Sequence, residues 1–284
     1  MIGIIGGSGL YQIEGVKITR EERLETPFGY PSDSIFVGEM NGKGVAFLPR
    51  HGRGHIISPS KINYRANIYA MKMLGVSKII SISAVGSMKE SLHPGDVVII
   101  DQLIDRTRGR VNTFFDEGIV VHISFSDPIC EEMARILYEA ASKVGARVKK
   151  GGTYVCIEGP AFSTRAESML YRSWGVDVIG MTCYQEARLA REAEICYAAA
   201  AMITDYDCWH ETEEDVNIQS VLTVLKKNTE VAKELVKQAV SMLDDSSMSC
   251  SCHSALKDAI LTDPAYISKD TRERLSLLLN KYIK

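Results

Sequence analysis

Two carboxylates, two residues apart, follow a long apolar run late in the chain. The run 198–203 is typical of a buried strand, and Thr204-Asp205-Tyr206-Asp207 comes directly after it. Residues i and i+2 of a strand point to the same side, so Asp205 and Asp207 would converge. Converging acids raise each other's pKa, so that one can hold a proton near neutral pH and donate it to a purine leaving group. The alternative is a solvated loop with two ordinary acids.

A second candidate site is the segment 49–55, which contains two Arg and two His among glycines. It follows the apolar run 45–48. The guanidinium of Arg50 offers a fork of N–H donors that binds phosphate oxygens in bidentate fashion, with His51 beside it. The pattern favours an anion site, and the alternative is a basic surface loop.

Three other segments offer weaker signals. In Gly6–Gly9, a glycine-rich turn would expose backbone N–H groups and Ser8 adds a hydroxyl, although neither a dinucleotide fingerprint nor a P-loop is present. Segment 83–87 places small residues and a hydroxyl at a strand end. Segment 158–163 carries Phe162, which could stack on a flat heterocycle. Each segment alone also fits a plain turn, a strand-end serine or core packing.

The elements that would position these segments alternate between strands and helices. Strands are predicted over 78–83, 96–100, 153–157, 176–181 and 197–204. Helices are predicted over 61–74, 129–144, 164–174 (opened by a capping box), 186–194 and 218–243. This alternation predicts an α/β fold with a largely parallel sheet. The candidate segments follow strands, and ligands bind at the carboxyl ends of strands in such sheets, so the pattern indicates a site for phosphate and a nitrogenous base.

Composition limits the class of partner. The 284 residues are 45% hydrophobic, enough for a sizeable core, and the net charge of −3 predicts neither nucleic acid nor membrane as partner. No apolar run approaches the roughly 20 residues that span a bilayer. The first residues lack a basic n-region and fit a first strand, so we expect a cytoplasmic protein. We expect one domain over 1–243, with 244–284 as an extension of it that carries Cys-Ser-Cys and a short helix.

Seven cysteines do not fit a secreted scaffold of this size. The pair Cys250-Ser251-Cys252 has no second CxxC or His partner at zinc-finger spacing, so the spacing predicts no metal. We predict that this pair oxidises, either with itself or with a core cysteine such as Cys130 or Cys196, and so tethers the C-terminal segment. The alternative is two exposed free thiols.

Taken together, the motifs resemble those of the purine nucleoside phosphorylase superfamily. They run in order as Gly3–Leu10, Arg50–Arg53, Ser83–Ser87, Ile157–Ser163 and Thr204–Asp207. The resemblance implies a single α/β domain with a central mixed β-sheet flanked by helices, assembled as a trimer or a dimer of trimers. It implies phosphorolysis of 5′-methylthioadenosine to adenine and 5-methylthioribose 1-phosphate, a reaction of purine and methionine salvage. Inorganic phosphate would be a co-substrate, with no cofactor and no metal.

The resemblance also implies roles for individual residues. Phosphate would be held by Ser8, Arg50, His51, Ser83, Ala84 and Thr182. The nucleoside would be bound by Met181, Phe162, Ser163, Asp205, Tyr206 and Asp207, with the two acids catalytic and facing purine N7 and the 6-amino group. The 5′-group pocket would comprise Val216, Ile218, Val221 and Leu222, with His122 from a neighbouring subunit. The chain departs from the family at Ala161, where Arg is common, and at Gln185, where Pro is usual before the Glu.

Two other functions remain open at this point. One is a phosphorylase for 6-oxopurine nucleosides or methylthioinosine, although relatives of that kind tend to place Asn where Asp205 stands. The other is a non-catalytic nucleoside sensor on the same fold. Comparing adenosine-type with inosine-type substrates, in the presence of phosphate, separates the three.

Overall fold

The computed structural model describes residues 1–7, 13, 15–210, 218–243 and 250–283, without the side chains of 218–223. The strands are β1 (Ile2–Gly6), β2 (Lys17–Glu22), β3 (Ile35–Met40), β4 (Lys43–Pro49), β5 (Lys78–Ser87), β6 (Val97–Ile99), β7 (Gln102–Arg106), β8 (Val148–Lys150), β9 (Thr153–Ile157), β10 (Val178–Gly180) and β11 (Cys196–Asp205). The helices are α1 (Tyr64–Met73), α2 (Glu131–Lys143), α3 (Arg165–Ser173), α4 (Cys183–Glu192), α5 (Ile218–Met242), α6 (Lys269–Arg274) and α7 (Ser276–Leu279). Short 3-10 turns are η1 (Pro59–Lys61), η2 (Asp207–Trp209), η3 (Ser251–Ser254) and η4 (Pro264–Tyr266).

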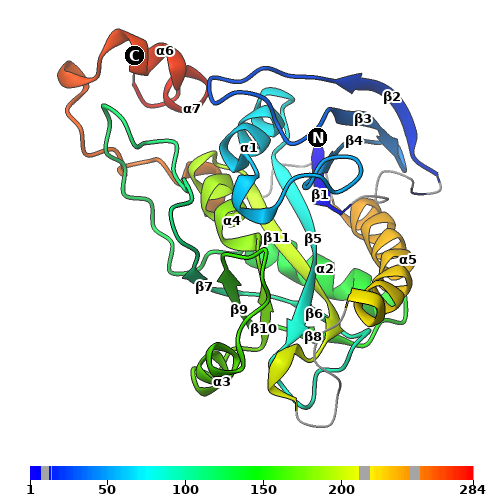
Figure 1. The fold of residues 1–284 in the computed structure, drawn as a ribbon. Coiled ribbons are helices and arrows are strands. Elements are labelled where there is room, and N and C mark those ends of the chain that lie inside the picture. The colour runs from blue at the N-terminus through cyan, green and yellow to red at the C-terminus, as the bar shows by residue number, and fades with distance from the viewer. Residues whose placement is uncertain (8–12, 14, 211–217, 244–249, 284) are drawn as a thin grey trace.

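In the described part of the chain, the strands form one mixed sheet centred on β5 (Figure 1). Its main path is β2-β3-β4-β1-β5-β10-β9-β7, and β11 pairs with β5 and with β6. Strands β1 and β11 run parallel to β5, whereas β10 pairs antiparallel with the end of β5. The predicted α/β fold with a mixed sheet is therefore confirmed, and the parallel strands β1, β4, β5 and β11 end at one edge.

Helices cover the central strands on both sides. Figure 1 shows α1 and α4 on one side of β5 and β11, and α2 and α5 on the other. Helix α1 contacts α4, and α2 contacts α5. Because both faces are covered, β11 is apolar as far as Ile203 and is buried up to its last residue.

The predicted loop 83–87 is wrong, because β5 continues through it to Ser87. In this segment β5 pairs with β11 on one side and with β10 on the other. Ser83 is buried within the strand and Ala84 is exposed. The predicted C-terminal helix is also divided into α6 and α7, which meet at Leu275.

The C-terminal segment 250–283, called the tail from here on, packs into the same core as the sheet. Leu256, Leu275 and Leu279 are buried in one hydrophobic cluster with residues of β1, β5 and β11. A bridge between Val121 and Ile260 adds a backbone contact. Within the described residues, no helix is both long and apolar enough to cross a membrane.

Candidate functional site

The two acids meet through a turn and not through a strand. Asp205 is the last residue of β11, whereas Asp207 begins η2 with a left-handed backbone at φ 48°. The backbone N–H of Asp207 donates to Asp205 Oδ1 at 2.9 Å and closes the turn. The predicted i, i+2 strand geometry is therefore wrong, although the predicted convergence is confirmed. Gly86 leaves room for the pair, since a Cβ there would lie 3.0 Å from Asp205 Oδ1.

The surroundings of the two carboxyls differ. Burial raises the pKa of Asp205, and the hydrogen bond from Thr204 Oγ1 at 2.6 Å opposes this only in part. Repulsion from Asp207 is the smallest contribution, so burial, and not the expected mutual repulsion, is the main cause. Asp207 accepts hydrogen bonds from Ser163 Oγ at 2.7 Å and Ser168 Oγ at 2.5 Å. The pair thus consists of one carboxyl with a raised pKa, Asp205, and one carboxyl that accepts two hydroxyl hydrogen bonds, Asp207.

Ser168 was not found from the sequence, because a serine inside a helix gives no signal of its own. It lies on α3, which begins with the predicted capping box: Thr164 Oγ1 accepts from the Glu167 N–H, and the Glu167 carboxylate accepts from the Thr164 N–H. The capping box is confirmed. It fixes the start of the helix and thereby places Ser168 beside Asp207.

Arg50 lies at the same edge of the sheet as the acid pair. It directly follows β4, and its side chain is buried. Its Nε and Nη2 pair with the carboxylate of Glu186 on α4, and Nη2 also donates to Ser81 Oγ at 2.7 Å. Burial alone lowers the pKa of Arg50, but the charge and hydrogen bonds of Glu186 outweigh it, so Arg50 stays a cation. Glu186 offsets this charge, and the site is less cationic than the sequence pattern indicates.

His51 is a neutral acceptor and not a cation. Its Nδ1 lies 2.8 Å from the carbonyl oxygen of Ile57, which can only accept, so Nδ1 carries the proton. Burial and the neighbouring Arg50 lower the pKa of His51 to about 4. Nε2 is then left to accept a hydrogen bond, for example from the hydroxyl of a monoprotonated phosphate. Arg53 is exposed and pairs with Asp33 at 3.1 Å, so it lies outside the anion site.

The residues that follow β10 form a third part of the candidate site. Thr182 is buried at the N-cap of α4, where backbone N–H groups and the helix dipole favour an anion. Met181 precedes it, and a Cβ at Gly159 would lie 2.5 Å from its sulfur, so the two segments pack closely. The ring of Phe162 is 50% exposed, which excludes the core-packing alternative for this residue.

Arg110 holds these segments together and was missed by the sequence analysis. Its buried guanidinium donates to the carbonyl of Met181 at 2.6 Å and to the Glu158 carboxylate at 3.1 Å. It also donates to Tyr64 Oη at 3.1 Å. In the sequence, Arg106, Arg108 and Arg110 look like a basic surface loop, and only the fold shows that the third points inward.

The remaining predicted residues are placed only in part. His122 is exposed, and its backbone N–H donates to the backbone carbonyl of Ala259 in the tail at 2.9 Å. Its role across a subunit contact stays a prediction. The ring of Tyr206 stacks on His210 with centroids 4.6 Å apart. Ser8 and Val216 lie outside the described residues, and Ile218, Val221 and Leu222 are on α5 without described side chains.

Residues 1–241 match the sequence model of the phosphorylase superfamily. The chain belongs to the phosphorylase superfamily. It is 55% identical to the S-methyl-5′-thioadenosine phosphorylase of Geobacter sulfurreducens, over 100% of this chain and 99% of that protein. The relative from Hyperthermus butylicus with the same name is 52% identical, over 92% of this chain and 95% of that protein.

Solved structures of the superfamily give the same result. A methylthioadenosine phosphorylase from an antarctic soil metagenomic library superposes with a TM-score of 0.94 at 50% identity, covering 98% of both chains. The methylthioadenosine phosphorylase of Schistosoma mansoni in complex with adenine has a TM-score of 0.83 at 34% identity, covering 98% of this chain and 97% of that one. The resemblance predicted from the motifs is thus confirmed.

Proposed function

We propose that this chain catalyses the phosphorolysis of 5′-methylthioadenosine to adenine and 5-methylthioribose 1-phosphate. The observation that carries the proposal is the unlike acid pair at the end of β11, in which Asp205 has a raised pKa and Asp207 is held by two hydroxyls. The names of full-length relatives at 50–55% identity support the same substrate. The Arg50 region and the N-terminus of α4 supply a place for the second substrate, phosphate.

The reaction breaks the C1′–N9 bond and forms a bond from C1′ to a phosphate oxygen. The electron pair of the broken bond goes to the purine, and the ribose carries positive charge in the transition state. A proton from Asp205 to purine N7 neutralises the departing base, and Asp205 regains its proton from water. General acid catalysis of this kind supplies about 10²–10⁴-fold in rate. Phosphate stabilises the ribose cation before it bonds to C1′.

Asp207 would recognise the base, while Asp205 protonates it. The Asp207 carboxylate accepts from the two serine hydroxyls, so it is suited to accept a further hydrogen bond from a 6-amino group. It would repel the 6-oxo oxygen of inosine-type substrates. This assignment gives Asp205 the transferable proton, a choice that the sequence left open.

For phosphate, we propose binding by Arg50, neutral His51 and the N-terminus of α4 at Thr182, with Ser8, Ser83 and Ala84 as further contacts. For the sugar, Met181 would lie against the ribose, and Val216, Ile218, Val221 and Leu222 would surround the methylthio group. Burying a methylthio group stabilises the complex by about 1–3 kcal/mol relative to a hydroxyl. Adenosine should therefore be the poorer substrate.

We also propose that the chain forms a homo-oligomer, a trimer or a dimer of trimers. Support comes from apolar side chains on α3 and at its C-cap that are half exposed in the single chain: Met169 at 55%, Leu170 at 47% and Trp174 at 45%. Such a surface is typical of a protein contact. Light scattering coupled to size-exclusion chromatography measures the mass, and a monomer would contradict the proposal.

The decisive experiment measures product formation from methylthioadenosine, adenosine, methylthioinosine and inosine, each with and without phosphate. We expect adenine release that requires phosphate, with methylthioadenosine the preferred substrate. Equal release without phosphate would indicate a hydrolase. A preference for the inosine-type substrates would indicate the 6-oxopurine alternative. Binding without any product would indicate the sensor.

A further inference from the structure

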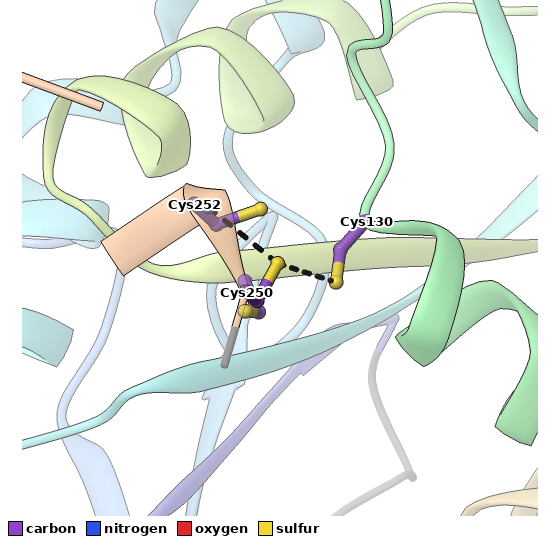
Figure 2. A group of neighbouring side chains, drawn as sticks. Cys130, Cys250 and Cys252 are labelled. Carbon is purple, nitrogen blue, oxygen red and sulfur yellow. Dashed lines mark hydrogen bonds between the residues drawn. The ribbon is translucent and has the colours of Figure 1, made fainter. Parts of the chain in front are cut away.

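Four cysteines from three distant segments lie together at the opposite end of β11 from the acid pair. Cys130 is the N-cap of α2 and Cys196 is the first residue of β11, while Cys250 and Cys252 belong to the tail. Their four sulfur atoms all lie within 4.8 Å of one another. Figure 2 shows Cys130, Cys250 and Cys252 pointing toward one another. We call these four residues the cysteine cluster.

The spacing of the sulfurs suits a central ion. In a tetrahedral zinc site, metal–sulfur bonds of about 2.3 Å place the sulfurs about 3.8 Å apart. The Cys130 and Cys250 sulfurs are 3.6 Å apart, in this range. A disulfide instead requires about 2.05 Å between two sulfurs and would divide the cluster into separate pairs. The mutual proximity of all four sulfurs is the arrangement that a single soft cation needs.

The surroundings hold the ligands in place. The N–H of Cys130 donates to the carbonyl of Tyr197 at 2.9 Å and ties the start of α2 to β11. The N–H of Cys252 points to the sulfur of Cys250 at 3.5 Å. His253 bridges the other side, with Nδ1 3.1 Å from the Glu194 carbonyl and Nε2 3.5 Å from the Cys196 sulfur. Hydrogen bonds around the ligands in this way orient them and stabilise the negative charge on metal-bound thiolates.

We propose that the cysteine cluster binds one zinc-class divalent ion in a tetrahedral all-sulfur site, and that this ion fastens the tail to α2 and β11. Two ligands come from the core and two from the tail, so the ion closes a long loop of chain. The sequence by itself predicts no metal, because no second pair of ligands lies at zinc-finger spacing from Cys250 and Cys252. Here the second pair is assembled from residues 130 and 196.

Zinc binding by four thiols requires no oxidation or reduction. Four S–H bonds break, four zinc–sulfur bonds form, and four protons pass to water. The ion has no part in the proposed reaction, because β11 separates Cys196 from Asp205 by about 30 Å of strand. The site is closed by four protein ligands, which is the arrangement of structural zinc sites.

The test is the metal content of the full chain expressed with added zinc and purified with a reductant but without a chelator. Mass spectrometry of the metal should give about one zinc per chain. The variant Cys250→Ser/Cys252→Ser should retain almost none. Cys156→Ala is the matched control, because it removes a buried cysteine outside the cluster and should keep the zinc. Zinc retained equally by the double variant would overturn the proposal.

Two measurements on the wild-type chain serve if the double variant does not fold. X-ray absorption at the zinc edge should give four sulfur neighbours at about 2.3 Å. Removing the zinc with a strong chelator should lower the Tm, re-adding it should restore the Tm, and kcat at moderate temperature should not change. A wild-type chain that binds no zinc under these conditions overturns the proposal, and disulfides among these cysteines, found by peptide mapping, would then be the tether.

Discussion

The two carboxyls at the end of β11 are chemically alike, yet their neighbours give them different tasks. Burial raises the pKa of Asp205, which favours its protonated form. Ser163 and Ser168 donate hydrogen bonds to Asp207, which is the acceptor of the pair. A proton donor and a hydrogen-bond acceptor are thereby set side by side, as recognition and protonation of an aminopurine require.

Replacing Asp205→Asn should lower kcat for methylthioadenosine by about 10²-fold or more, because the amide cannot supply the proton. Asp207→Asn should instead shift preference toward 6-oxopurines, because an amide N–H can donate to the 6-oxo oxygen. In the wild type, kcat should fall as pH rises through the raised pKa of Asp205, and this fall should be absent in Asp205→Asn. Steady-state kinetics across pH with both substrate types measures this. Asp263→Asn, at an exposed position in the tail, is the control, and unchanged adenine selectivity in Asp207→Asn would contradict our account of base recognition.

A second buried acid bears on stability instead of catalysis. Glu192 is 1% exposed, and burial raises its pKa from 4.5 to about 7, although the Phe114 N–H and Thr113 Oγ1 donate to it. The folded chain therefore binds this proton more tightly than the unfolded chain does. The resulting stabilisation is complete below the unfolded pKa and is lost as pH rises through about 7.

Glu192→Gln should remove this part of the pH dependence. Urea unfolding at a series of pH values should show the wild type losing on the order of 3 kcal/mol more than the variant between acid and mildly alkaline pH. Glu139→Gln, at a partly exposed position on α2 where the carboxylate pairs with Arg135, is the control and should follow the wild type. Parallel curves for wild type and Glu192→Gln would show that Glu192 titrates normally in the fold.

At the scale of elements, the pair Arg50–Glu186 joins the end of β4 to α4. Arg50→Ala should lower the free energy of unfolding by about 3–5 kcal/mol, since it leaves Glu186 buried without its partner. Arg50→Ala/Glu186→Gln should recover part of that loss, while both variants show a raised KM for phosphate. Denaturant unfolding and phosphate kinetics measure the two effects separately. An unchanged KM for phosphate in the double variant would remove Arg50 from the phosphate site.

At the scale of the whole molecule, the tail is part of the core. Leu279 is 1% exposed in the common cluster, whereas Leu277 on the same short helix is 40% exposed. Leu279→Ala should destabilise the chain by about 2–5 kcal/mol, and Leu277→Ala by less than about 0.5 kcal/mol. Both should keep kcat at moderate temperature. Equal Tm values for the two variants would mean that the tail does not contribute to the cooperative core.

The sequence by itself determined the features that depend on short stretches of chain. The apolar run before Asp205 predicts a strand end, and the Thr164–Glu167 capping box predicts the start of α3. The order of the motifs was enough to indicate the superfamily. These features can be predicted from the sequence because burial periodicity and helix capping depend on residues that are near each other in the chain.

Only the tertiary structure decided which groups become partners across long separations. Arg50 and Glu186 are 136 residues apart in sequence, and Cys130 and Cys250 are 120 apart. No local pattern encodes such contacts, because they follow from which strands pair and which helices cover them. The neutral state of His51 is also a result of the fold, since burial and the nearby Arg50 set its pKa. The residue types that do the chemistry are thus visible in the sequence, but their charges and partners are set by packing.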